Sequence, residues 1–127
     1  MLNDPSRDSE QVRQVMESYV RGTYTGDAEL LKRCFHPKAA MSGYLGNQLI
    51  IATPEPFFQD IAGSPSMETA GYNYQGEIKS LQVTGEIALA VLYETEFRGS
   101  VTMESHFQLI RENGVWMIIS KNFTTIG

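Results

Sequence analysis

The stretch from Phe107 to Phe123, "FQLIRENGVWMIISKNF", decides the fold. It contains two runs in which apolar residues alternate with other residues, and the pair Asn113-Gly114 separates them. An Asn-Gly pair between two alternating runs is the strongest short-range indication of a tight β-hairpin. The stretch therefore predicts two long antiparallel strands, over 100–112 and 115–125.

Two further strands are predicted before this hairpin, over 72–84 and 86–97. Their links, Thr84-Gly85 and Arg98-Gly99, are too short for any connection other than an antiparallel hairpin. The run 86–97 is apolar on both faces where it starts, which is typical of a strand covered on both sides. The four strands form an antiparallel meander.

The N-terminal part of the chain predicts helices. Residues 6–24 carry one apolar stripe at helical spacing, made of Val12, Val15, Met16, Tyr19, Val20 and Thr23. Gly26 is suited to the left-handed end of this helix, and Asp27 can cap a second, shorter helix that reaches Cys34. Cys34 is expected to be a small buried apolar residue of this helix rather than a nucleophile.

The middle of the chain predicts two short strands and a third helix. The strands cover 38–45 and 47–52, the helix lies around 55–63, and a loop follows to about Gly71. Helices segregated to one face of a curved antiparallel sheet make an α+β fold. We therefore expect one domain, 1–127, with three N-terminal helices packed on the sheet.

Composition narrows the classes of function. The 127-residue chain has a net charge of −5 and one cysteine, and it lacks an apolar run long enough to span a membrane. We expect no nucleic-acid partner and no membrane partner. The first ten residues are polar and acidic, unlike a signal peptide, so we expect a cytoplasmic protein.

The order of these elements resembles the NTF2-like superfamily, and within it the SnoaL-like branch that is also called "putative lumazine-binding". The resemblance rests on "FHPKAAMSG" over 35–43, on the spacing from Tyr19 to Asp27, and above all on Phe107 to Phe123. It implies a cone-shaped α+β barrel with a pocket at its open end, often a homodimer through the sheet face. The fold hosts many activities, so it implies no single one.

The resemblance to ketosteroid isomerases within this superfamily bears on three residues. Tyr19 matches a tyrosine that donates a hydrogen bond to an enolate oxygen, although its place on the apolar stripe favours a core tyrosine whose hydroxyl finds a backbone partner. Gly43 stands close to where those enzymes carry their aspartate base, and Ser105 stands where they carry a second acid. The missing acids argue against steroid-isomerase chemistry.

Five other polar residues have two interpretations each. His36 could replace the missing base, or it could end the second helix at the corner before Pro37, where its charge favours the C-terminal helix dipole. His106 shares a strand face with Glu104 and is expected at a dimer interface rather than in the pocket. Glu94 and Glu96 share a face, where paired carboxylates could divide acid and base roles, but at the wet end of a strand they are expected to be solvated. Lys121 shares a face with Met117, Ile119 and Phe123, where it could serve an anionic ligand or extend outward to solvent.

The chain is rich in aromatic residues, which an apolar cavity for a small molecule requires. The predicted catalytic residues are Tyr19 and His36. The predicted ligand-binding residues are Tyr44, Phe57, Phe58, Tyr74, Tyr93, Ser105, Phe107 and Lys121. No metal and no cofactor are expected, because one histidine and one glutamate on a strand fall short of a metal site.

Three functions stay open on the sequence. The first is a protein that binds a small, mostly apolar ligand, with a cyclic compound as one option. The second is a cofactor-free isomerase, cyclase or dehydratase that uses acid/base chemistry. The third is a module for dimerisation or protein association without a ligand.

Overall fold

The computed structural model describes residues 5–127; the first four residues of the polar N-terminal stretch lie outside the described part. Its helices are α1 (Pro5–Thr25), α2 (Ala28–Cys34), α3 (Glu55–Gly63) and the single-turn α4 (Met67–Ala70). The three predicted helices are confirmed. Gly26 has the expected left-handed φ of 77°, and Asp27 caps α2 by accepting a hydrogen bond from the backbone N–H of Leu30 at 3.0 Å.

The strands are β1 (Phe35–Leu45), β2 (Gln48–Ala52), β3 (Gln75–Thr84), β4 (Ile87–Phe97), β5 (Val101–Glu112) and β6 (Val115–Thr125). They form one six-stranded sheet in the order β2-β1-β6-β5-β4-β3. The meander and the β1–β2 hairpin are antiparallel, as predicted, but β1 joins β6 in parallel. This one parallel pair merges the small hairpin and the meander into a single surface.

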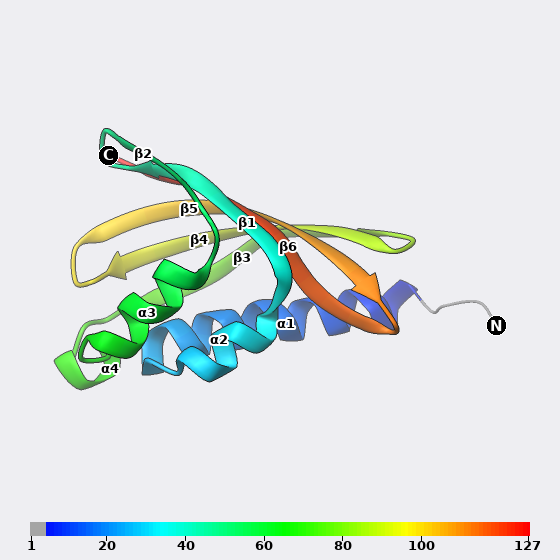
Figure 1. Ribbon diagram of the computed structural model, residues 1–127, viewed down its shortest axis with the longest axis horizontal. Coiled ribbons are helices and arrows are strands. Elements are labelled where there is room, and N and C mark those ends of the chain that lie inside the picture. The colour runs from blue at the N-terminus through cyan, green and yellow to red at the C-terminus, as the bar shows by residue number, and fades with distance from the viewer. Residues whose placement is uncertain (1–4) are drawn as a thin grey trace.

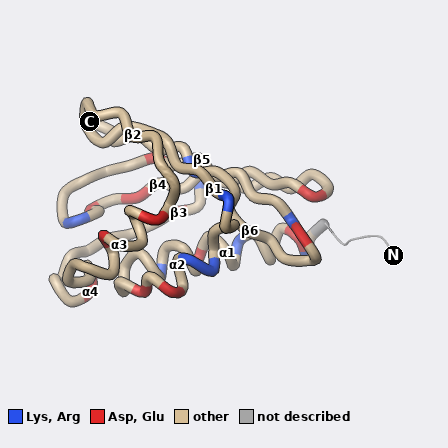
Figure 2. The backbone as a smooth tube through the Cα atoms, viewed as in Figure 1, with Lys and Arg blue, Asp and Glu red and all other residues tan. Residues whose placement is uncertain are grey.

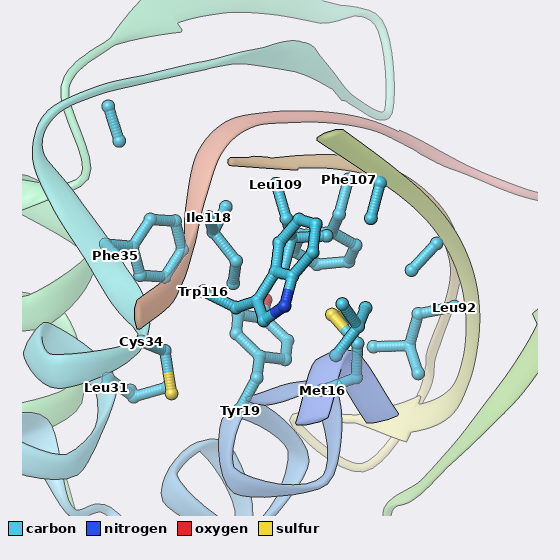
Figure 3. Packing of buried hydrophobic residues seen from close by; sticks show 14 of the residues in the cluster. Met16, Tyr19, Leu31, Cys34, Phe35, Leu92, Phe107, Leu109, Trp116 and Ile118 are labelled. Atoms are coloured by element: carbon cyan, nitrogen blue, oxygen red, sulfur yellow. The ribbon is translucent and has the colours of Figure 1, made fainter. Parts of the chain in front are cut away.

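The sheet curves over the helices, so that α1, α2 and α3 all lie on its concave side (Figure 1). The core lies between α1 and the inner face of the meander. Figure 3 shows Tyr19 rising from α1 toward Phe107 on β5, with Trp116 and Ile118 of β6 beside them. The ring centroids of Tyr19 and Phe107 are 5.0 Å apart, an edge-to-face contact that aromatic pairs favour.

The loop predicted before Gly71 contains α4, which the periodicity of so short a segment does not reveal. Strand β1 begins at Phe35 rather than at residue 38, because Phe35 already pairs with Ile118 of β6. His36 therefore lies within a strand, beyond the end of α2. The interpretation of His36 as the last residue of a helix is wrong.

Irregularities in the sheet change which side chains face inward. The β5–β6 register shifts between Gln108 and Leu109, where Ile119 has no partner. As a result Trp116 and Ile118 share the buried inner face with Lys121, whereas the simple alternation had placed Met117 and Ile119 there.

A second irregularity separates Glu94 from Glu96. The β4–β5 register shifts between Glu94 and Phe97, and Glu96 has a φ of 53°. Glu94 is 1% exposed, whereas Glu96 is exposed. The expectation that both carboxylates are solvated is therefore wrong for Glu94, because β4 still faces the core at this position.

Gly43 is explained by the close approach of β1 to β6. A Cβ atom at this position would lie 2.0 Å from the carbonyl oxygen of Phe123. No side chain fits there unless the two strands move apart. The glycine at the position where related isomerases carry their base is thus a packing requirement of this sheet.

Charged residues are distributed over several elements, with Lys32 and Arg33 adjacent on α2 (Figure 2). Beside Trp116, Arg111 of β5 forms an ion pair of 2.8 Å with the buried Asp8 of α1. This contact ties the first turns of α1 to the sheet. Within residues 5–127, no helix combines the length and the apolar character needed to cross a membrane.

Candidate functional site

An apolar pocket of about 250 Å³ opens between α3, the β1–β2 hairpin and the inner face of β4–β6. Its apolar walls are formed by Met41, Ile50, Phe57, Phe97, Met103 and Phe123. Two of its charged lining side chains, Lys121 of β6 and Glu94 of β4, are buried. We call this pair the polar inner end of the pocket.

Lys121 is 5% exposed, and its Nζ donates a hydrogen bond of 2.6 Å to the hydroxyl of Tyr19. Nζ also lies 4.9 Å from the ring centroid of Phe57 and 5.1 Å from that of Phe123. Lys121 forms no ion pair with any carboxylate among the described residues. Hence Lys121 neither snorkels to solvent nor pairs with a protein anion.

Glu94 accepts hydrogen bonds from two buried hydroxyl groups. Tyr74 Oη lies 2.5 Å from Glu94 Oε2, and Ser105 Oγ lies 3.4 Å from Glu94 Oε1. The Thr23 hydroxyl is buried beside Tyr19 and Tyr74, but among the described residues it has no hydrogen-bond partner. The carboxylate is therefore held by donors from the strand next to it and from the residue before β3.

Burial dominates the electrostatics of this cluster. Desolvation lowers the pKa of Lys121 below its ordinary value of 10.5, and the nearby Glu94 carboxylate partly opposes this effect. Desolvation, with Glu94 as the second cause, raises the pKa of both Tyr19 and Tyr74 well above 10. Both phenols are therefore protonated at neutral pH and act as hydrogen-bonding groups.

At the mouth of the pocket, Arg98 from the β4–β5 turn forms an ion pair with Asp60 of α3. The backbone of this turn takes left-handed conformations at Arg98 and Gly99, with φ values of 52° and 88°. The backbone N–H of Arg98 donates to the sulfur of Met67 in α4. The ion pair thus links the turn to the helix on the other side of the opening.

The structure gathers some of the predicted ligand-binding residues and separates others. Phe57 and Lys121 line the apolar pocket. Four lie immediately behind it, through their contacts with Lys121 or Glu94: Tyr19, Tyr74, Ser105 and Phe107. Phe58 is buried against Phe35 in the core, and Tyr44 is 47% exposed.

Tyr93 lies on the opposite face of the sheet from the pocket. It follows from the alternation along β4 that Tyr93 and its neighbour Glu94 point to opposite faces. The ammonium of Lys79 lies 5.2 Å from the Tyr93 ring centroid on this outer face. Tyr93 therefore cannot line the apolar pocket, which corrects its placement among the ligand-binding residues.

His36 is also remote from the pocket. Its Nε2 lies 3.2 Å from Glu112 at the end of β5, whereas the pocket is lined by Met103 near the start of that strand. Along its own strand, His36 lies five residues before Met41, which lines the pocket, and this is roughly 17 Å of extended chain. Phe35 packs against Tyr19, and alternation along β1 turns the imidazole of the next residue, His36, to the other side, where it contacts Glu112. The acid/base pair predicted from the sequence therefore does not form.

Sequence reasoning missed Glu94 as a site residue, and Asp60 and Arg98 at the mouth. For Glu94 a pattern was present, since Ala88, Ala90 and Leu92 precede it on one strand face. Cys34 is buried as predicted, and burial raises the pKa of its thiol to about 11. Within residues 5–127, histidines, cysteines and carboxylates form no group of three or more suited to a metal ion.

Comparison with known proteins agrees with this architecture. Two crystal structures of NTF2-like proteins of unknown function match with a TM-score of 0.86. The one from Shewanella baltica OS155 is 19% identical and covers 99% of both chains. The one from Silicibacter pomeroyi DSS-3 is 22% identical and covers 98% of this chain and 100% of its own.

A protein of the NTF2-like family from Streptomyces avermitilis, described as a "putative dehydratase", is more distant in structure. It matches with a TM-score of 0.69 and 18% identity over 98% of this chain and 99% of its own. No curated protein matches the chain significantly. The model of the family described as "Putative lumazine-binding" matches residues 7–124. The chain therefore belongs to this family, and it has the fold of these NTF2-like structures.

Proposed function

We propose that the apolar pocket binds a small, mostly apolar ligand with one or two rings. The observation that carries this proposal is the pocket itself, in which apolar walls enclose a single polar inner end. Small-molecule sites are typically built in this way, with a few polar groups that fix the orientation of the ligand. The family description also points to a small molecule.

The size of the pocket supports a small ligand. Its volume of about 250 Å³ lies below the range of about 300–1,000 Å³ that is typical of sites for drug-sized molecules. Phe57 and Phe123 supply flat aromatic surface on the walls, against which a planar ring can stack. A bicyclic compound is therefore the largest ligand that we expect to fit.

The uncharged bicyclic compound 2-naphthamide tests this proposal. We expect it to bind the protein in a titration followed by NMR, with shifted resonances for Phe57 and Met103. Ala52→Trp fills the pocket from β2 and should abolish binding. Ala62→Trp makes the same change on the exposed side of α3 and should leave binding intact. Equal binding by both variants would place the ligand elsewhere and refute the proposal.

The polar inner end favours a second function, the isomerase or dehydratase chemistry of a cofactor-free enzyme. Glu94 and Lys121 both line the pocket. In this function Glu94 takes a proton from the carbon next to a ligand carbonyl. The Lys121 ammonium, held by Tyr19, stabilises the enolate oxygen that forms. Glu94 then returns the proton to the same or a neighbouring carbon.

Exchange of carbon-bound protons tests this second function. With 2-tetralone as substrate in D₂O, we expect the wild-type protein to accelerate incorporation of deuterium next to the carbonyl. Glu94→Gln should remove the acceleration, whereas Glu96→Gln, on the exposed side of the same strand, should not. The same exchange rate with and without wild-type protein would end this proposal.

We also propose that the chain forms a homodimer through the outer face of the sheet and acts in the cytoplasm. Apolar side chains on β4 support the dimer, with Ile87 59% and Leu89 50% exposed. His106 and Glu104 lie on the same face, 2.6 Å apart. Light scattering should give the mass of a dimer, and His106→Asp should give a monomer. A monomeric wild-type protein would contradict this assembly.

A further inference from the structure

The charged groups that line the apolar pocket differ in how well the protein satisfies them. Asp60 and Arg98 pair with each other at the mouth. Glu94 accepts a hydrogen bond from a hydroxyl group on each of its two oxygens. Lys121 has three N–H donors, and among residues 5–127 only the Tyr19 hydroxyl accepts from it. The ammonium is therefore the least satisfied charge of the pocket.

Aromatic rings partly compensate the buried ammonium. Nζ lies 4.9 Å, 5.1 Å and 5.9 Å from the ring centroids of Phe57, Phe123 and Phe107. Rings attract a cation, but more weakly than a carboxylate in contact with it does. Glu94 acts on Lys121 only through space, since the two side chains form no ion pair.

Resting on the proposed function, we propose that the ligand is a cyclic carboxylate whose carboxylate group binds Lys121. Its two oxygens accept the two N–H groups of Lys121 that have no acceptor in the protein. Its ring lies toward the mouth, between Phe57 and Phe123. The hydroxyl groups of Tyr74 and Ser105 already donate hydrogen bonds to the Glu94 carboxylate. Glu94 therefore does not compete with the ligand carboxylate for the N–H groups of Lys121.

A neutral amine at Lys121 is the competing state, because burial lowers the pKa of this lysine. The two states predict opposite preferences. An ammonium favours a carboxylate over an isosteric amide, whereas a neutral amine surrounded by rings favours the uncharged amide. A matched pair of ligands therefore distinguishes them directly.

The experiment compares 2-naphthoate with 2-naphthamide, which have the same shape and differ in charge. We expect wild-type protein at pH 7 to bind 2-naphthoate at least about tenfold more tightly than 2-naphthamide, because hydrogen bonds between charged groups are stronger than those to a neutral amide. Lys121→Met should reduce this preference to unity or reverse it, because the loss of the ammonium weakens the binding of 2-naphthoate more than that of 2-naphthamide. Lys121→Arg should retain part of the preference.

Two controls keep the result interpretable. Lys79→Met makes the same change on the outer face of the sheet and should leave both affinities unchanged. Thermal unfolding of Lys121→Met should show a single cooperative transition, and its retained binding of 2-naphthamide reports an intact pocket.

Three outcomes would overturn the inference. Tighter binding of 2-naphthamide than of 2-naphthoate by wild-type protein would exclude a carboxylate ligand while leaving the proposed ligand pocket standing. A preference for 2-naphthoate that persists in Lys121→Met would exclude Lys121 as the anchor. If wild-type protein binds neither compound, the proposed function itself fails, and the inference fails with it.

Discussion

The phenol of Tyr74 donates a hydrogen bond to Glu94 Oε2 at 2.5 Å, and both residues are buried. Tyr74 stands directly before β3 and Glu94 near the end of β4, so this contact joins the two strands at the inner end of the pocket. A carboxylate in such a place is tolerated only with donors around it, because burial removes its water.

Replacement of Tyr74 by phenylalanine should destabilise the protein. The change removes one of the two hydroxyl donors of Glu94, and a buried acceptor that loses its donor costs about 1–3 kcal/mol. We expect the free energy of unfolding in urea to fall by about that amount. Tyr72→Phe is the matched control, because Tyr72 is 41% exposed and should change stability little. Equal losses in the two variants would show that the Tyr74 hydroxyl contributes nothing specific.

Gly43→Ala should be severely destabilising. A Cβ at this position would lie 2.0 Å from the Phe123 carbonyl oxygen, so the parallel β1–β6 pair would have to separate. We expect a loss of more than about 3 kcal/mol of unfolding free energy, or no folded protein. Gly63→Ala near the end of α3 meets open space and should be neutral or slightly stabilising. A Gly43→Ala protein as stable as wild type would contradict the close approach.

The contribution of Lys121 to stability should depend on pH. Because its pKa in the folded state lies below 10.5, the unfolded chain binds more protons at this group as the pH approaches 10.5. The free energy of unfolding therefore rises with pH through this lysine, by at most about 1.4 kcal/mol per pH unit. Below the folded-state pKa of Lys121, the buried ammonium lowers the free energy of unfolding by its full amount.

Urea unfolding of wild type and Lys121→Met between pH 7 and 9.5 measures this effect. The difference, wild type minus variant, cancels the groups that both proteins share. It should shift in favour of wild type as the pH rises. A difference that falls over this range would mean that the folded-state pKa of Lys121 is raised rather than lowered.

Substitutions should distinguish the walls of the pocket from His36. Phe57→Ala removes a ring from the wall and should weaken the binding of 2-naphthamide about three- to tenfold, in line with the strength of aromatic contacts. His36→Gln should leave the affinity within about twofold, since His36 contacts Glu112 at the far end of β5. Clearly weaker binding of 2-naphthamide by His36→Gln would contradict the placement of His36 outside the pocket.

The arrangement of strands and helices followed from local patterns. Asn113-Gly114 indicated the β5–β6 hairpin, and the stripe that includes Met16 and Tyr19 indicated α1. These features depend on residues close together in the chain, where turn geometry and helical spacing act directly. The parallel pairing of β1 with β6 depends on residues far apart in the sequence, and no local pattern encodes it.

The site was only partly accessible from the sequence, because alternation along a strand fails where the strand bulges. The unpaired Ile119 brings Trp116 and Ile118 onto the face of Lys121, and the irregularity after Glu94 moves Glu96 to solvent. A bulge accompanies the bending of the whole sheet, which depends on distant residues. The two-residue periodicity of one strand therefore does not predict where a bulge lies.

By itself, then, the sequence determined the α+β class, the hairpins and the inward stripe of α1, since turn residues and periodicity act over short distances. The tertiary structure alone decided that Glu94 and Lys121 meet at one buried pocket while His36 lies elsewhere. The physical reason is that burial of a charged group depends on what the curved sheet and α3 place around it, and those neighbours come from distant parts of the chain.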